Sequence, residues 1–479
     1  MTNVLLATSN GVGMGHLTRQ AAVALVMSRQ HRPTLFSLSV GLPLATALSI
    51  SGEYCPSYDQ PWVTGRSWHG YLKGRLMAIV EETKAEVVLF DGVAVYPGIM
   101  RARSELRDVA FIWLRRGMWR QQTNEAQVRR ESFFDRVIEP GDLAGDSDLG
   151  PTAGQRNVAK VSPISLLEAI DVLPRDQARA ALGLPLDREI ALVTLGSGRL
   201  GDVVGPGEVA IRALLEESDL HIAVTRPAVA RMVVDVAGTD RVTEIRDVYP
   251  QVSYLSAFDL GVSSAGYNAV HELIPAGVPA LFVANTSTRT DDQETRSRRL
   301  EELGLALGAR DVDPSAIADG IGKLLDRKFR ADLAAAATAT RARIAGASET
   351  ARVTADFGRG YTARRRSPAV VVSQQIQIAK EALKDRLGEE RTNTLKRMLG
   401  REPSPVGEKV KVRIVDQPRS PNGAGATPLA VTEDLSRSDL DLGTPIEHLL
   451  PGSSDGYRVK RLEMVETYYE VVSTPNERT

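Results

Sequence analysis

Close to the N-terminus, alternating glycines lead into a histidine whose side chain is suited to proton transfer. Gly11, Gly13 and Gly15 precede His16, and no Asp or Glu occurs before Glu53. Histidine titrates near neutral pH and is the side chain most often used as a general base. We interpret His16 as functional, because a plain turn of small residues needs no histidine. The alternative is a turn residue that is hydrogen-bonded to the backbone.

The glycine pattern does not fit a dinucleotide-binding turn. The Gly-x-Gly-x-x-Gly fingerprint would need a glycine three residues after Gly13, where His16 stands. It would also need an acidic ribose ligand about 20 residues further along the chain. No acidic residue is present there. The sequence therefore argues against an NAD-binding domain.

Alternating strands and helices are expected to position His16. Residues 4–8 form an apolar run before the glycine turn, residues 17–29 have helical spacing, and residues 85–92 predict a further strand. This alternation is typical of an α/β domain with a parallel sheet. Ligands bind such sheets at the carboxyl ends of the strands. Both His16 and Asp91 follow directly after such ends.

The same alternation restarts near residue 188 and continues to about residue 358. We therefore predict two α/β domains, an N-terminal one over 1–160 and a C-terminal one over 161–358. Residues 359–479 are predicted to be an appendage, partly flexible because of a Pro/Gly/Ala-rich spacer. The sequence indicates no chemistry for this appendage.

Bulk composition restricts the class of protein. The 479 residues are 43% hydrophobic and 25% charged, with a formal net charge of −1, so charge alone indicates neither nucleic acid nor an anionic membrane. Cys55 is the only cysteine, which excludes an internal disulfide. No apolar run reaches the ~18 residues of a membrane span, and the N-terminus lacks the features of a signal peptide. We expect a soluble cytoplasmic protein that does not bind nucleic acid.

Residues 249–293 contain a second group of motifs. In chain order they are Pro250-Gln251, Ser264-Ala265-Gly266-Tyr267-Asn268-Ala269, Glu272, Gly277-Val278-Pro279 and Asp292-Gln293. Together they resemble the donor-binding region of nucleotide-sugar glycosyltransferases with the GT-B fold. They are similar to the UDP-glycosyltransferases and to the peptidoglycan N-acetylglucosaminyltransferase that makes lipid II. Ser264 replaces the histidine of the plant-type block, and the interval from Glu272 to Gln293 is a few residues longer than in that pattern.

The resemblance covers about residues 1–357 and implies two Rossmann-like domains facing a cleft, with a nucleotide-sugar donor on the second. A strand end, a small-residue turn and a helix start direct free backbone N–H groups at a diphosphate. Glu272 is then placed to accept hydrogen bonds from both ribose hydroxyls. The remaining residues that we assign to the donor site are Gly13, Gly15, Gly196, Ser197, Ser264, Gly266, Tyr267, Asn268, Asp292 and Gln293. A tight turn at 196–198 and a solvated loop at 292–293 are the structural alternatives.

In an inverting transfer, His16 would remove the proton of the acceptor hydroxyl as that oxygen attacks the anomeric carbon. In the related enzymes an Asp after a later strand orients this histidine, and Asp91 matches that position; a helix N-cap is the alternative. Helix ends would stabilise the leaving UDP, so we expect no metal and no other cofactor. The Asp-x-Asp patterns at 146–148 and 311–313 are interpreted as structural.

The four tryptophans, Trp62, Trp68, Trp113 and Trp119, all lie in the first domain. They are typical of core packing, but such rings also stack on sugars. The Trp113–Trp119 region places basic side chains among aromatics. This suits peripheral contact with the inner face of a membrane, a diphosphate-lipid acceptor, or a solvated basic surface.

The sequence therefore predicts an inverting, metal-independent hexosyltransferase that transfers a sugar from a UDP-sugar to an acceptor hydroxyl. The acceptor classes are a glycolipid, a cell-envelope precursor or a small molecule. One alternative is a catalytically silent nucleotide-sugar binder, whose function lies in the appendage. The other is a UDP-sugar 2-epimerase of the same fold, which the acid-free N-terminal turn argues against.

Overall fold

A computed structural model describes residues 1–9, 14–57, 65–196, 203–226, 239–362, 370–382, 409–414, 432–436 and 462–468. The contacts divide the chain into two compact units. The first comprises Met1–Cys55 and Tyr71–Gln374, and the second comprises Pro56–Gly70 and Gln375–Thr479. All the described residues that we assigned to catalysis or donor binding lie in the first unit.

The first unit begins with a seven-stranded sheet in the order β3-β2-β1-β4-β5-β6-β7, paired in parallel throughout. The chain order reverses between β1 and β4, which makes the carboxyl ends of these two strands the topological switch point where α/β sheets bind ligands. The strands are β1 (Asn3–Thr8), β2 (Arg32–Ser37), β3 (Gly52–Tyr54), β4 (Val87–Asp91), β5 (Ala110–Leu114), β6 (Arg136–Pro140) and β7 (Val158–Val161).

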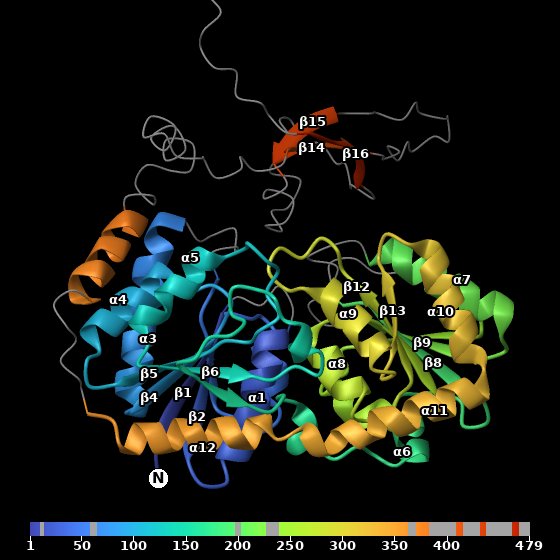
Figure 1. Ribbon diagram of the computed structural model, residues 1–479, viewed down its shortest axis with the longest axis horizontal. Helices are drawn as coiled ribbons and strands as arrows, with labels where there is room; N and C mark the ends of the chain where they lie inside the picture. Colours follow the sequence, from blue (N-terminus) through green and yellow to red (C-terminus); the bar gives the residue numbers. More distant parts are fainter. Residues whose placement is uncertain are drawn as a thin grey trace, which may run out of the picture. The chain divides into compact units, whose positions relative to one another are not determined.

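A second sheet in the same unit has the order β10-β9-β8-β11-β12-β13 and is also parallel. Its switch point lies between β8 and β11, so it repeats the arrangement of the first sheet (Figure 1). The strands are β8 (Ile190–Thr194), β9 (His221–Arg226), β10 (Val242–Arg246), β11 (Leu260–Ser264), β12 (Ala280–Ala284) and β13 (Leu307–Arg310). The two α/β domains expected from the sequence are thus present.

Helices connect the strands of both sheets. Those that follow strands of the first sheet are α1 (Gly15–Met27), α2 (Leu42–Thr46), α3 (Gly65–Thr83), α4 (Pro97–Glu105) and α5 (Glu125–Val128). The second domain contains α6 (Arg175–Ala181), α7 (Val204–Glu217), α8 (Tyr267–Leu273), α9 (Gln293–Glu302), α10 (Pro314–Leu325) and α11 (Arg327–Thr338). Short 3-10 helices are η1 (Arg129–Phe133), η2 (Gly145–Ser147), η3 (Leu166–Glu168), η4 (Gln251–Ala257) and η5 (Ala339–Arg343).

The last helix of the first unit, α12 (Gly346–Arg359), crosses back to the first domain. It packs on α1 and β4, and its residue Gly358 lies so close to Val87 that an added Cβ would come within 2.4 Å of that side chain (Figure 1). The sequence prediction that residues up to 358 close the second domain is therefore wrong for this helix. Small residues on its buried face permit close approach to a sheet but do not specify which sheet.

The two Asp-x-Asp patterns serve the fold. Asp313 caps the N-terminus of α10 by accepting from Ala316 N at 3.0 Å, and Asp311 accepts from the Thr286 hydroxyl at 2.7 Å. Asp148 accepts from Met118 N at 2.9 Å, and Asp146 pairs with Arg299 at 2.6 Å. The predicted helix start at Asp313-Pro314 is thus confirmed, and the structural interpretation of both patterns stays a prediction.

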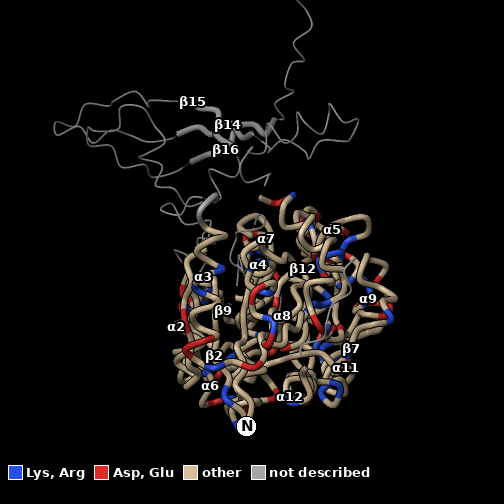
Figure 2. Tube along the Cα trace, turned by 90° about the vertical axis from the view of Figure 1, so that its left-hand side faces the viewer, with Lys and Arg blue, Asp and Glu red and all other residues tan. Residues whose placement is uncertain are grey.

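The described part of the second unit contains residues 375–382 of a helix that includes residues 370–382, and a three-stranded antiparallel sheet. The sheet has the order β15-β14-β16, with β14 (Lys409–Ile414), β15 (Thr432–Ser436) and β16 (Leu462–Tyr468). In the first unit, Lys and Arg are interspersed with Asp and Glu along the described trace (Figure 2). In the described ranges no helix is both long and apolar enough to cross a membrane.

Candidate active site

His16 and Asp91 lie together at the switch point of the first sheet. Thr8, at the end of β1, is in register with Asp91, at the end of β4, and α1 begins immediately before His16. The Nδ1 atom of His16 lies 2.8 Å from Oδ1 of Asp91. Tyr96 occupies the N-cap position of α4, so the alternative role of Asp91 as its N-cap is not observed.

Arg19 completes this cluster and was not identified from the sequence. Its Nε donates to Oδ2 of Asp91 at 3.0 Å and its Nη2 donates to Oδ1 at 2.8 Å. Both side chains are nearly fully buried, whereas His16 retains 15% of its side-chain exposure. Arg19 follows His16 by three residues on α1, a spacing that places two side chains on one face of a helix. That spacing is the signal that would have found it.

The buried charges of this cluster shift its proton affinities. Burial lowers the pKa of His16; Asp91 opposes this, while the cations of Arg19 and Arg116 add to it. Burial alone would raise the pKa of Asp91, but Arg19 and His16 together hold it below its usual value. His16 is therefore a neutral imidazole beside an ionised carboxylate, which is the protonation state that a general base requires.

The turns assigned to the donor lie side by side at the switch point of the second sheet. Gly196 follows β8 with φ +96°, which favours glycine, and an added Cβ there would lie 4.0 Å from Oγ of Ser264. Gly266 is the N-cap of α8, and a Cβ on it would lie 3.8 Å from the same oxygen. Gly13 and Ser197, which the sequence also suggested, lie outside the described residues.

Glu272 is located on α8, four residues after Asn268, so the two share one face of the helix. Burial raises the pKa of its carboxyl group to about 8. Among the described residues, no side chain forms a hydrogen bond or ion pair with this carboxyl group. A partly buried acid without a protein partner has its hydrogen-bonding capacity available for a ligand.

Tyr267 and Asn268 connect α8 to the first domain. The buried hydroxyl of Tyr267 donates to Gly141 O at 2.9 Å and accepts from Ile164 N at 3.0 Å. Asn268 Nδ2 donates to Gly15 O at 3.2 Å, one residue before His16. The Tyr267 hydroxyl therefore has protein partners on both sides, and only the backbone N–H of Tyr267 remains available to a nucleotide-sugar. Asn268 joins the turn next to the donor site to the turn that carries His16.

Asp292 and Gln293 lie where the two α/β domains are in contact, a region that we call the seam. Asp292 N donates to Met118 O at 2.8 Å, and its side chain caps α9. The Gln293 side chain accepts from Asn285 N at 3.1 Å and donates to Asp291 at 3.2 Å. In the described structure both side chains thus have protein partners, and their assignment to the donor sugar stays a prediction.

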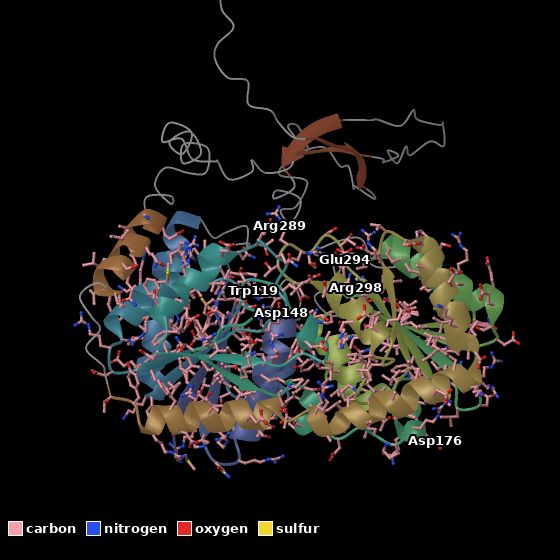
Figure 3. All side chains as sticks on the ribbon, viewed as in Figure 1. Trp119, Asp148, Asp176, Arg289, Glu294 and Arg298 are labelled. Atoms are coloured by element: carbon pink, nitrogen blue, oxygen red, sulfur yellow. The ribbon has the colours of Figure 1, made fainter. Side chains whose placement is uncertain are left out.

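Charged residues close the same seam. Arg296 is fully buried and pairs with Asp142 of the first domain at 2.8 Å and with Asp291 at 2.9 Å. Arg116, also from the first domain, binds Asp291 at 2.9 Å. Trp119 forms a β-bridge with Asp291, and Figure 3 shows it where the two domains meet. These contacts hold the loop that precedes α9 against the first domain.

The interpretation of the Trp113–Trp119 region as a membrane contact is wrong. Trp113 and Trp119 are almost completely buried, and the Trp113 indole donates to Gly92 O at 2.8 Å. Arg115 is buried too, with its guanidinium over the Trp113 ring. The segment consists of β5 and the seam, so its aromatic rings cannot reach a lipid surface. Trp68 is buried as well, and Trp62 lies outside the described residues.

The comparisons with known proteins agree with this architecture. Residues 220–351 match the model of the glycosyltransferase family 28 C-terminal domain, a range that includes β9 to β13 of the second sheet. The chain belongs to the family of nucleotide-sugar glycosyltransferases with the GT-B fold.

Its curated relatives include two enzymes named UDP-N-acetylglucosamine--N-acetylmuramyl-(pentapeptide) pyrophosphoryl-undecaprenol N-acetylglucosamine transferase. The one from Ralstonia nicotianae is 32% identical over 367 residues, covering 70% of this chain and 92% of that enzyme. The one from Salinibacter ruber is 31% identical over 154 residues, covering 29% of this chain and only 39% of that enzyme.

Solved structures share the fold. The spinosyn rhamnosyltransferase SpnG has a TM-score of 0.52 at 14% identity, covering 74% of this chain and 100% of that one. A UDP-GlcNAc 2-epimerase from Neisseria meningitidis, bound to UDP-GlcNAc, has a TM-score of 0.55 at 12% identity with the same coverage. At these identities the likeness concerns the fold and not the reaction.

Proposed function

We propose that this protein transfers a sugar from a UDP-sugar to an acceptor hydroxyl, with inversion at the anomeric carbon and without a metal ion. The observation that carries the proposal is the 2.8 Å contact between His16 and Asp91 at the carboxyl ends of β1 and β4. A neutral histidine held by a carboxylate is the arrangement used to deprotonate a hydroxyl group.

In the proposed reaction, Nε2 of His16 takes the proton of the acceptor hydroxyl. The acceptor oxygen forms a bond to the anomeric carbon from the face opposite UDP, and the bond from that carbon to the diphosphate oxygen breaks. UDP leaves with the electron pair, and its new charge is stabilised by backbone N–H groups at the start of α8 and at the Gly196 turn. Attack from the opposite face accounts for inversion.

Glu272 supports the nucleotide end of this proposal. Its carboxyl group has no protein partner among the described residues, and it shares a helix face with Asn268, which contacts the His16 turn. Two ribose hydroxyls would supply the donors that this carboxylate lacks. The names of the curated relatives suggest UDP-N-acetylglucosamine as the first donor to test, with a lipid-linked diphosphate saccharide as the first acceptor. A cytoplasmic location stays a prediction from the sequence.

The epimerase alternative receives less support from the charges of the site. Near His16 and along the seam, three buried aspartates each have an arginine partner: Asp91 with Arg19, Asp142 with Arg296, and Asp291 with Arg116. Unlike these three aspartates, Glu272 has no arginine partner among the described residues. An epimerase needs several acidic groups at the sugar.

Incubation with a panel of UDP-sugars, with and without acceptor, separates the alternatives. Release of UDP by transfer or slow hydrolysis supports the proposal, and the anomeric configuration of the product tests inversion. Conversion of the donor sugar to its 2-epimer would identify an epimerase. Binding of the donor with neither outcome would identify a catalytically silent protein.

A further inference from the structure

The Nδ1 atom of His16 forms a tight triangle with one side-chain atom of Asp91 and one of Arg19. Its Nδ1 lies 2.8 Å from Asp91 Oδ1 and 2.7 Å from Arg19 Nη2, and these two atoms are themselves 2.8 Å apart. Arg19 can only donate and an ionised Asp91 can only accept, so Nδ1 can satisfy one of them at a time. The neutral ring therefore carries its proton on Nδ1 if Asp91 is the partner, and on Nε2 if Arg19 is the partner.

Asp91, and not Arg19, is the expected hydrogen-bond partner of this ring nitrogen. Arg19 already donates to both oxygens of Asp91, so its charge is satisfied without His16. Carboxylate oxygens accept several hydrogen bonds, and Oδ1 has capacity for the ring N–H as well. With the proton on Nδ1, the lone pair is on Nε2, which is the atom that the transfer reaction requires.

We propose that Arg19 is a positioning residue that orients Asp91, which keeps the neutral His16 protonated on Nδ1, and that the charge of Arg19 prevents protonation of Nε2 before the acceptor binds. This inference rests on the proposed function for its purpose, but its geometry does not. Without Arg19, Asp91 would face His16 alone and would form a full ion pair with the imidazolium. A histidine so paired would keep its proton to a higher pH and would act as a base over a narrower pH range.

The other groups around His16 act in the same direction or are already paired. Arg116 approaches from the loop after β5 and lowers the pKa of His16 further, although Asp291 binds its guanidinium at 2.9 Å. On α8, the ring of Tyr267 lies under Arg19 at 5.2 Å, and burial raises the pKa of its hydroxyl, so it stays neutral. His271 of the same helix is neutral as well, because burial lowers its pKa to about 4.

The test measures the pKa and the tautomer of His16 by ¹⁵N NMR of the ring, together with the acid limb of the kcat/KM profile. In Arg19→Met we expect the pKa of His16 and the acid limb to rise by about one pH unit or more, because Asp91 loses its other cation. In Asp91→Asn both should fall. The double variant should lie between them, since it removes one charge of each sign.

Arg103→Met is the matched control. Arg103 is also a buried arginine of the first domain, and it binds both oxygens of Asp135 at 2.8 and 3.0 Å. It should lower stability without moving the pKa of His16. If Arg19→Met does not fold, the comparison of Asp91→Asn with the double variant still isolates Arg19, because removing the arginine at fixed Asn should raise the pKa.

An unchanged or lowered pKa of His16 on removal of Arg19 would overturn the proposal. So would a neutral His16 with its proton on Nε2 in the unmodified protein. If the unmodified protein releases no UDP from any donor, the proposed function fails. The NMR comparison would still decide the role of Arg19, since it requires no turnover.

Discussion

Binding of UDP should release a proton, because Glu272 must ionise to accept hydrogen bonds from two ribose hydroxyls. Burial raises the pKa of this carboxyl group to about 8, so at pH 7 roughly 0.9 of the molecules hold the proton before UDP binds. Each hydrogen bond to the carboxylate favours the charged form by about 1.5–3 kcal/mol, which corresponds to about 1–2 pKa units. Bound UDP should therefore lower the pKa well below 7.

The affinity for UDP should increase with pH. Only the ionised form offers two acceptors, so affinity for UDP should rise with pH up to the pKa of the free protein and then level off. With a pKa of about 8, the ionised fraction grows about fivefold from pH 7 to pH 8 and less than twofold from pH 8 to pH 9. The UDP phosphate titrates near pH ~6, so it contributes little in this window.

Isothermal calorimetry at pH 7 in buffers of different ionisation enthalpy counts the released protons. The unmodified protein should release close to one proton per UDP, and Glu272→Gln, which cannot ionise, should release almost none. The same variant should lose the rise in affinity from pH 7 to pH 8. Binding of dUDP provides a second check, since one lost hydroxyl should weaken it about ten- to a hundredfold relative to UDP.

Uptake of a proton, or equal release by the unmodified protein and Glu272→Gln, would refute the reasoning. Equal affinities for UDP and dUDP would show that Glu272 does not bind the ribose. In that case its raised pKa would be a property of burial alone, and the nucleotide would have to be held by other residues.

The remaining predictions concern the base, the metal and the seam. His16→Ala should lower kcat by about 10²–10⁴-fold while UDP affinity in calorimetry stays nearly unchanged, and near-normal turnover would exclude His16 as the base. Activity should survive exhaustive EDTA treatment, whereas a loss reversed by Mg²⁺ would contradict leaving-group stabilisation by backbone N–H groups. Asp142→Ala should lower the free energy of unfolding by about 3 kcal/mol in denaturant titrations, because it removes a partner of the fully buried Arg296. Asp146→Ala, which breaks an exposed pair with Arg299, should cost less than ~1 kcal/mol, and similar losses for both variants would argue against the seam as a stabilising contact.

Local patterns in the sequence were sufficient for the two α/β domains and for the turns that carry the proposed chemistry. Parallel strands are buried on both faces, so β1 and β4 appear in the sequence as continuous apolar runs. The carboxyl ends of parallel strands meet at one edge of a sheet, which placed both His16 and Asp91 at that edge, and the family resemblance implied that the two side chains pair. Their 2.8 Å contact confirms that proximity, while their catalytic roles stay predictions.

Contacts between residues far apart in the chain required the tertiary structure. Arg19 meets Asp91 across 72 positions, and Arg296 meets Asp142 across 154. The spacing of Arg19 from His16 is a local signal for the first pair, but the second pair has none, because the packing of whole domains selects the partner of Arg296. The amphipathic pattern of α12 likewise predicts a buried face without specifying that it lies on the first sheet.

For the tryptophans and for Asp292-Gln293, the sequence likewise gives the residue type but not the solvent exposure. Composition identifies a segment as aromatic and basic, or a pair as polar, but the solvent exposure of each side chain depends on what folds over it. Trp113 lies in a central strand and Trp119 in the domain seam, so both are buried instead of exposed to lipid. Asp292 and Gln293 are bound by backbone and side-chain partners at the start of α9. Residue types and their spacing thus determined which chemistry is available, and the packing of the two domains decided which side chains remain open to a ligand.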